Sequence, residues 1–233
     1  MKVEIWSDVV CPWCYIGKRR LETALAGFAH REQIEVVWRS FELDPNAPRV
    51  QEGDPATRLA SKYGMSRQQA IAAQDHLTSV ARDDGLEFHL ATAQSGNSFD
   101  AHRLVHLAAE YGLGDQMKER LFSAYLVEGQ AIGDLDTLIC LAGEVGIDET
   151  RANDVLRGDE YAAQVRADEA EARDFGISGV PFFVIDRTYG ISGAQPAETL
   201  ADALAKAWES TEPLARVATG SEAGACDRDQ CAR

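Results

Sequence analysis

The sequence predicts an α/β fold in which both ends of the chain form a small β-containing frame around an all-helical middle. Residues 3–41 have the pattern of a strand, a helix and a second strand. Residues 55–175 carry apolar side chains at helical spacing, and residues 181–208 return to short apolar runs before one more helix. The helical segment is therefore expected as a large insertion between the second and third strands.

The changes in periodicity also predict the domain boundaries. A chain of 233 residues fits one domain that carries a large insertion. We expect the frame to consist of residues 1–50 and 176–210, and the inserted helical domain to consist of residues 51–175. Residues 211–233 are polar and contain Gly and Ala, so we expect a flexible tail there.

The opening unit is predicted to be a strand, a helix and a strand. Residues 3–7 alternate and contain Val, Ile and Trp, which is typical of a short strand. Residues 15–28 place apolar side chains at helical spacing, and residues 34–41 form a second extended run. This pattern is that of a βαβ unit, with two cysteines between its first strand and its helix.

The middle segment is predicted to contain five or six helices. Its glycine-containing breaks lie near residues 64, 85, 112–114 and 129–133. One helix has an apolar stripe that consists of Leu135, Leu138, Ile139, Ala142 and Val145. We assign Cys140 to this stripe and expect it to be an inert core thiol.

The carboxyl-terminal part is predicted to be a β-hairpin followed by a helix. Residues 181–185 and 189–191 are short apolar runs, and the turn-like sequence Asp186-Arg187-Thr188 joins them. Pro196 is suited to the first turn of a last helix that extends to about residue 208.

Composition excludes several classes of partner. The chain has 38 acidic and 23 basic side chains and a formal net charge of -15. Nucleic acid and anionic membrane surfaces both repel such an acidic body, so we expect neither as a partner. The sequence shows neither a secretory signal nor a run of about 18 apolar residues, and we expect a cytoplasmic protein.

The pair Cys11 and Cys14 is the strongest indication of chemistry. It follows a predicted strand and opens a predicted helix, where unpaired N–H groups and the helix dipole stabilise a thiolate. Cys11 is then the nucleophile, and Cys14, one turn later, resolves the mixed disulfide. Pro12 suits the first turn, where it loses no hydrogen bond. Half of a zinc site, or two inert core thiols, are the alternatives.

Pro181 opens the third predicted strand. A proline at that place needs no functional reason, because it gives up no interior hydrogen bond of the sheet. The alternative is a cis bond between Val180 and Pro181 in a loop that faces Cys11. Such a bond would present the Val180 backbone to the extended chain of a substrate beside the thiols.

Three segments carry a family resemblance: residues 7–17 around the cysteine pair, residues 179–183 around Pro181, and residues 97–103 in the helical segment. They resemble the DsbA-like thioredoxin superfamily, in particular its FrnE-like branch, over essentially residues 1–210. The resemblance implies a thioredoxin-like fold with a large all-helical insertion domain. It also implies disulfide oxidoreductase activity through Cys11 and Cys14, and a cis bond before Pro181.

Two departures from the pattern matter. Trp13 stands where the strongly oxidising relatives have His, so the direction of electron flow stays open among oxidation, reduction and isomerisation of disulfides. Kappa-class glutathione transferases and 2-hydroxychromene-2-carboxylate isomerases resemble the chain but have Ser at the first cysteine. Cys11 argues against their chemistry.

The other candidate residues are assigned smaller roles. The resemblance suggests that Cys226 and Cys231 form an auxiliary redox pair that exchanges disulfides with the first pair; a transient zinc site and two incidental thiols in a tail are the alternatives. His102 is placed near the thiols by the resemblance. His102 and His106 are four residues apart, a spacing that suits a metal, but no acidic motif accompanies them. Lys18 and Arg19 are expected to be solvated; the alternative is that they add positive potential along the first helix.

We therefore predict a thiol–disulfide oxidoreductase with a redox-active disulfide. Substrate contacts are assigned to Pro12, Trp13, Val180 and Pro181. No motif requires a metal, nucleotide or flavin, and the expected partners are protein disulfides or low-molecular thiols. The alternatives are a thiol-dependent isomerase or transferase that acts on an aromatic or polyketide compound, and a chaperone-like peptide binder.

Overall fold

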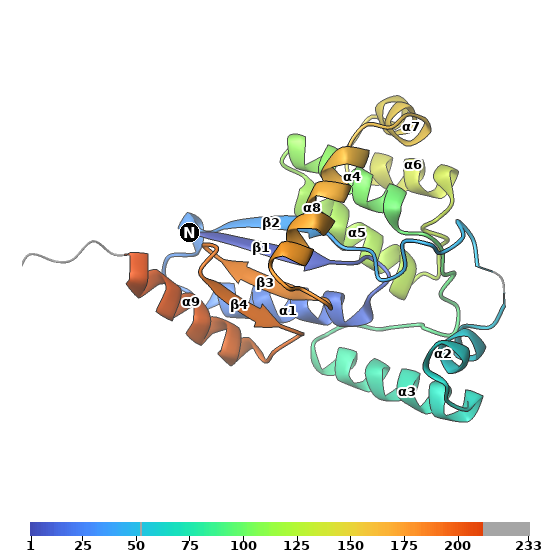
Figure 1. Ribbon diagram of the computed structural model, residues 1–233, viewed down its shortest axis with the longest axis horizontal. Coiled ribbons are helices and arrows are strands. Elements are labelled where there is room, and N and C mark those ends of the chain that lie inside the picture. The colour runs from blue at the N-terminus through green and yellow to red at the C-terminus, as the bar shows by residue number, and fades with distance from the viewer. Residues whose placement is uncertain (52, 212–233) are drawn as a thin grey trace, which may run out of the picture.

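The protein, described by a computed structural model for residues 1–51 and 53–211, contains a mixed four-stranded sheet with helices on both of its faces (Figure 1). The strand order is β2-β1-β3-β4. The strands are β1 (Lys2–Ser7), β2 (Glu35–Ser40), β3 (Phe182–Ile185) and β4 (Tyr189–Ser192). β2 is parallel to β1, whereas β3 is antiparallel to both β1 and β4.

The described part of the chain contains nine α-helices and a 3₁₀ turn at Arg31–Gln33. The helices are α1 (Pro12–Ala26), α2 (Pro55–Tyr63), α3 (Arg67–Asp83), α4 (Phe99–Glu110), α5 (Gly114–Leu126), α6 (Leu135–Glu144), α7 (Glu149–Arg157), α8 (Ala162–Asp174) and α9 (Ala197–Thr211). Helices α2 to α8 all lie between β2 and β3 in the chain. The predicted α/β fold with a helical insertion between the second and third strands is confirmed.

The predicted number of inserted helices was too small. The described residues contain seven between β2 and β3, not five or six. Two boundaries were missed: the one between α7 and α8, where Gly158 follows the end of α7, and the one between α6 and α7, where Gly146 has φ +93° and the Asp148 carboxylate accepts from the N–H of Arg151. An Asp at an N-cap satisfies a free N–H at the helix start, so this short sequence ends one helix and begins the next.

The side chains of β1 point alternately to the two faces of the sheet. Val3 and Ile5 belong to the large core that α1 and α9 also line. Trp6 points to the other face, where its Nε1–H donates to the carbonyl of Asp168 on α8 at 2.9 Å. Figure 1 shows α8 crossing the sheet near β2, while α1 and α9 lie against each other. Because side chains alternate along a strand, β1 anchors both layers.

The βαβ unit and the hairpin are confirmed. β1 and β2 pair in parallel from Lys2 with Glu35 to Ser7 with Ser40, and α1 connects them. β3 and β4 pair antiparallel across a turn in which Asp186 and Arg187 have φ values of +45° and +55°. Two consecutive positive φ values suit the twist of a tight hairpin.

A buried arginine joins two of the inserted helices. Arg103 on α4 is 3% exposed. Its guanidinium donates to the Asp100 carboxylate at 2.8 Å. It also donates to four backbone carbonyls at the end of α7 and just beyond it: Val155, Leu156, Gly158 and Glu160. Arg103 thus satisfies carbonyls that the helix end leaves without partners.

Cys140 is not a core thiol, contrary to the sequence-based prediction. It is exposed on α6, whereas Leu138, Leu141 and Ala142 are buried. Positions 138 and 140 lie about 200° apart around a helix of 3.6 residues per turn, so they occupy opposite sides. The inward face of α6 was therefore misassigned at this residue.

Lys18 is not solvated, contrary to the sequence-based prediction. Its side chain is 4% exposed and pairs with Asp115 at 3.2 Å, with Glu119 at 3.1 Å and with Glu22. α5 supplies two of these carboxylates, and packing of α5 on α1 covers the lysine. The neighbouring Arg19 is partly exposed and also pairs with Glu119.

Within residues 1–51 and 53–211, no helix combines the length and the apolar character that crossing a bilayer requires.

Candidate active site

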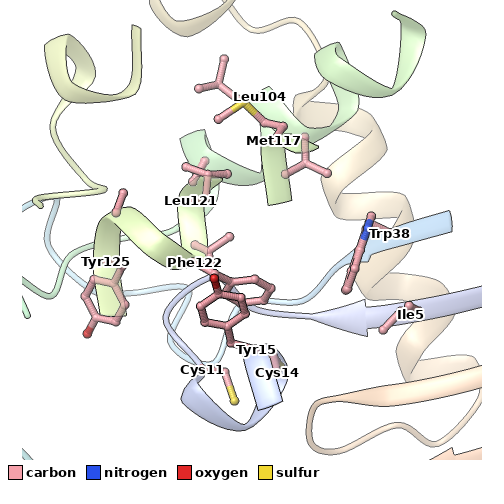
Figure 2. Packing of buried hydrophobic residues seen from close by; sticks show 14 of the residues in the cluster. Ile5, Cys11, Cys14, Tyr15, Trp38, Leu104, Met117, Leu121, Phe122 and Tyr125 are labelled. Atoms are coloured by element: carbon pink, nitrogen blue, oxygen red, sulfur yellow. The ribbon is translucent and has the colours of Figure 1, made fainter. Parts of the chain in front are cut away.

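The two cysteines lie at the start of α1, as predicted. Cys11 is the N-cap and Pro12 is the first residue of the helix. The backbone N–H of Cys14 donates to the carbonyl of Cys11 at 3.0 Å, so the two residues are one tight turn apart. Figure 2 shows both side chains beside the packed rings of Tyr15 and Phe122. A thiolate at Cys11 faces the positive end of the helix.

The two thiols lie in different environments. Both thiols are free; Cys11 is 5% exposed and Cys14 is 1% exposed. Burial raises the pKa of Cys14 well above its usual range, and the neighbouring Cys11 raises it further. The Ser7 hydroxyl and the Lys118 ammonium act in the opposite direction but do not outweigh burial. Cys14 is therefore a protonated thiol in the resting dithiol state.

The loop before β3 faces the first cysteine. The bond between Val180 and Pro181 is cis, and the Cys11 Sγ lies 3.7 Å from the carbonyl oxygen of Val180. The N–H of Gly193 donates to the carbonyl of Pro181 at 2.8 Å, which fixes the loop to the hairpin. The structure therefore brings together four of the assigned residues: Cys11, Cys14, Val180 and Pro181.

Close packing of α1 on this loop depends on Gly17. A Cβ at Gly17 would lie 3.0 Å from Cγ of Pro181 and 3.3 Å from the ring of Phe183. Any larger residue would push the loop away from the helix. Gly17 thus sets the short separation between the cysteine turn and the Val180 carbonyl.

An apolar rim borders Cys11. Trp13 is 40% exposed, an unusual position for a large apolar side chain, and Pro12 and Val180 are partly exposed. The rim is therefore accessible beside a sulfur that is itself mostly covered.

Asp8, three residues before Cys11, is a buried carboxylate that the sequence-based assignment did not use. It accepts from the N–H of Leu43 at 2.7 Å, and its backbone carbonyl accepts from the N–H of Cys11 at 3.1 Å. Burial opposes its ionisation, but His102 and the Leu43 N–H outweigh burial and lower the pKa of Asp8. Asp8 therefore carries a negative charge behind the cysteine turn.

His102 lies close to this carboxylate. The residue is 1% exposed, and its Nε2 is 3.4 Å from Asp8 Oδ1. Burial lowers the pKa of His102 despite the carboxylate. His106 points elsewhere, with Nε2 3.1 Å from both the Ser40 hydroxyl and an Asp168 oxygen. The two histidines thus have separate partners, and the described residues contain no group of three or more side chains that could ligate a metal.

Lys118 is the most unexpected residue near the cysteines. It lies on α5, is 0% exposed, and donates from Nζ to the carbonyl of Ser7 at 3.1 Å. Its spacing to Leu121 and Phe122, three and four residues later, places it on the apolar face of α5. That spacing was a signal in the sequence, because a lysine on an apolar helical face needs a reason. Cys226 and Cys231, by contrast, lie outside the described residues.

A carboxyl group with an unusual pKa follows β2. The Glu42 side chain is 0% exposed and pairs with Arg166, which also binds Glu169 at 2.8 Å. Burial raises the pKa of Glu42 to about 7, and the Glu169 carboxylate contributes, although Arg166 acts against both. Glu42 lies next to Leu43, whose N–H binds Asp8.

This carboxyl group predicts a pH dependence of stability. Because the folded-state pKa lies above the unfolded one, the contribution of Glu42 is fully present below the unfolded pKa and is lost as pH rises through about 7. Glu42→Gln should therefore gain stability relative to wild type between pH 5 and pH 8, by about 1–3 kcal/mol. Urea unfolding at several pH values measures this difference. Glu32→Gln, at an exposed residue of the 3₁₀ turn, is the control; a pH-independent difference for Glu42→Gln would contradict the assignment.

Comparisons with known proteins agree with this geometry. The model of a family described as the DSBA-like thioredoxin domain matches residues 2–205. The uncharacterized protein YwbO of Bacillus subtilis (strain 168) is 31% identical over 189 residues, which are 80% of this chain and 87% of that protein.

Solved structures show the same fold. A crystal structure of a probable DsbA oxidoreductase from Streptomyces coelicolor has a TM-score of 0.87 and 45% identity, and the match covers 98% of this chain and 97% of that one. The cytosolic disulfide reductase DsbM from Pseudomonas aeruginosa has a TM-score of 0.62 at 18% identity, over 90% of this chain and 99% of that one. The chain therefore belongs to the DSBA-like thioredoxin domain family, and it is an oxidoreductase of that general kind.

Proposed function

We propose that the protein exchanges disulfides through Cys11 and Cys14. The Cys11 thiolate attacks a substrate disulfide, forms a mixed disulfide and releases one substrate thiol. Cys14 then attacks the Cys11 sulfur, closes the Cys11–Cys14 disulfide and releases the second substrate thiol. The reverse sequence oxidises a substrate dithiol. The observation that carries the proposal is a cysteine at the N-cap of α1, with a buried thiol one turn later.

The surroundings of Cys11 favour a protein disulfide as substrate. Its sulfur lies 3.7 Å from the Val180 carbonyl, so an extended peptide bound along the Val180 backbone would pass directly over it. Trp13 adds an exposed aromatic surface beside the same sulfur. Low-molecular disulfides need fewer of these contacts and are the second substrate class. Electron pairs move only between sulfur atoms, so the reaction requires no separate cofactor.

We propose a cytoplasmic location for this activity. The support is the resemblance of fold to a protein described as a cytosolic disulfide reductase. The five cysteines of the chain, an odd number, also suit a reducing compartment. Whether Cys226 and Cys231 relay electrons to the first pair stays a prediction, and redox titration of Cys11–Cys14 with and without residues 211–233 would test it.

Trapping the mixed disulfide tests the proposed order of attack. Cys14→Ser lacks the thiol that carries out the second displacement. The mixed disulfide between Cys11 and the substrate should therefore accumulate to near stoichiometric amounts. Mass spectrometry of peptides after alkylation locates it, and dithiothreitol should release it. Cys140→Ser, at an exposed cysteine far along the chain, is the matched control and should resolve its adduct normally. An adduct located on Cys140 in place of Cys11 would refute the proposed order.

A further inference from the structure

A fully buried lysine faces the cysteine pair from the inserted helices. Lys118 on α5 donates to the Ser7 carbonyl, and its ammonium lies 5.4 Å from the ring centroid of Trp38 and 5.3 Å from that of Phe122. Figure 2 shows Phe122 next to the cysteine turn and Trp38 farther away, on the strand beside Ile5. Among the described residues, no carboxylate lies within ion-pair distance of the Lys118 Nζ. The direct contacts of the ammonium group are therefore weak ones, to two aromatic rings and one carbonyl oxygen.

An ammonium in such a place is costly to bury and is expected to have a function or a compensating charge. Burial lowers the pKa of Lys118 to about 8, and negative groups around it act in the opposite direction. The titratable groups that face it come from four elements: Cys14 and Cys11 on α1, Asp8 after β1, Asp168 on α8 and His102 on α4. Among these groups, Cys14 has the largest effect in raising the pKa of Lys118, and Lys118 in turn acts to lower the pKa of Cys14.

The contacts place Ser7 between the lysine and the second cysteine. Lys118 Nζ is 3.1 Å from the Ser7 carbonyl oxygen, and the Ser7 side chain lies near enough to Cys14 to act toward a lower pKa of that thiol. Burial disfavours a thiolate at Cys14, yet resolution requires one at the moment of attack. The resolution step therefore needs a positive charge near Cys14, and Lys118 supplies one.

Building on the proposed function, we propose that Lys118 is a positioning residue for resolution, whose buried positive charge stabilises the Cys14 thiolate as it attacks the mixed disulfide. The Cys14 sulfur loses its proton and forms a bond to the Cys11 sulfur. The bond between Cys11 and the substrate sulfur breaks, and the substrate sulfur leaves with the electron pair and takes up one proton. Lys118 keeps its own proton throughout, so the step balances without another reactant.

Linkage between Lys118 and the two sulfurs makes the proposal measurable in the wild-type protein. Closing the Cys11–Cys14 disulfide removes both titratable sulfur groups that act to raise the pKa of Lys118, so this pKa should be lower in the disulfide form than in the dithiol form. Carbon NMR of lysine labelled at Cε, followed against pH in the dithiol and disulfide forms, reports this shift. A lysine with a purely structural role would titrate at the same pH in both forms.

The kinetic test separates the two displacements. The substrate is dithiobis(nitrobenzoate), an aromatic disulfide that releases a coloured thiol. One equivalent of this thiol should appear when Cys11 attacks the reagent and forms a mixed disulfide. A second equivalent should appear when Cys14 displaces the aromatic thiol from Cys11. All proteins carry Cys140→Ser, Cys226→Ser and Cys231→Ser in the full-length chain. Lys118→Met, which keeps an unbranched side chain only one atom shorter and removes the charge, should slow the second release at least about tenfold at pH 7. Lys62→Met, at an exposed lysine of α2, is the matched control.

The pH profile distinguishes the proposed role from general damage. In wild type, the second release should level off or decline above about pH 8, as Lys118 loses its charge. In Lys118→Met it should rise steadily with pH, because the fraction of Cys14 thiolate then increases with no opposing loss of a lysine charge. The variant should unfold at a urea concentration no lower than wild type, because a buried unpaired ammonium has been removed. Should Lys118→Met fail to fold, the NMR comparison in wild type decides.

The outcomes for the two proposals differ. If wild type releases no thiol through Cys11, the proposed function fails. If wild type shows both phases, but Lys118→Met leaves the second phase and its pH profile unchanged, the role of Lys118 is overturned. An identical Lys118 titration in the dithiol and disulfide forms overturns it as well. A slower second phase with a changed profile, together with a redox-dependent titration, establishes it.

Discussion

Cys11→Ser is expected to abolish thiol–disulfide exchange. A serine hydroxyl does not ionise at neutral pH and cannot form a disulfide, so the first displacement has no nucleophile. In the insulin assay with dithiothreitol as electron source, the catalysed rate should fall by at least about a hundredfold, to the rate of dithiothreitol alone. Sulfur and oxygen differ little in size, and Cys11 makes few polar contacts, so the fold should be retained. Turbidity of precipitating insulin chains measures the rate.

The control for this prediction is Cys140→Ser, which should reduce insulin as fast as wild type. A Cys11→Ser protein that is folded and still active would contradict the assignment of the nucleophile. Turnover of an aromatic or polyketide compound by the serine variant would indicate an isomerase or transferase. Suppression of aggregation without thiol turnover in wild type would instead indicate a peptide binder. One set of assays on two variants therefore separates the three functions considered from the sequence.

Arg103→Ala is expected to cause the largest loss of stability. It removes the donor that binds four backbone carbonyls at the end of α7, and it leaves the Asp100 carboxylate without its buried partner. Truncating one member of a buried charged network typically lowers the free energy of unfolding by about 3–5 kcal/mol. Urea unfolding, followed by tryptophan fluorescence, measures the change. The slope of the transition should stay the same unless the variant is already partly unfolded.

Arg151→Ala provides a matched control on α7. Arg151 also reaches Glu160, but it does so at the surface, where its side chain is 32% exposed and that of Glu160 is 50% exposed. Exposed ion pairs are screened by water and contribute little, so its removal should hardly move the urea midpoint. Equal losses for the two variants would show that burial of Arg103 has no special importance. A small loss for Arg103→Ala would show that solvent readily replaces its contacts.

Cys11 and Arg103 both belong to segments that the sequence analysis singled out, but for different reasons. Cys11 was assigned from local information: a strand, a turn and a helix within residues 3–28 place its sulfur at a helix start whatever the rest of the fold does. Arg103 lies in a segment that only resembled a family pattern, and nothing local indicated its partners. Its contacts come from α7, about 50 residues later in the chain.

The sequence by itself determined the features that depend on neighbouring residues. Hydrophobic periodicity predicted the βαβ unit, the helical insertion and the hairpin, because side-chain direction repeats every two residues in a strand and every 3.6 in a helix. The same local logic placed Cys11 and Cys14 at the start of α1. It failed where a short capping sequence, at Gly146 and Asp148, ended one helix and began another.

Only the tertiary structure decided which charges are buried and which apolar-looking positions are exposed. Lys18 and Lys118 are covered because α5 packs against α1 and β2, and Cys140 is exposed because no element among residues 1–51 and 53–211 covers its side of α6. The proximity of Val180 to Cys11 joins residues 169 positions apart. Burial and electrostatic coupling depend on elements that meet only after folding, so the pattern of single residues along the chain does not contain them.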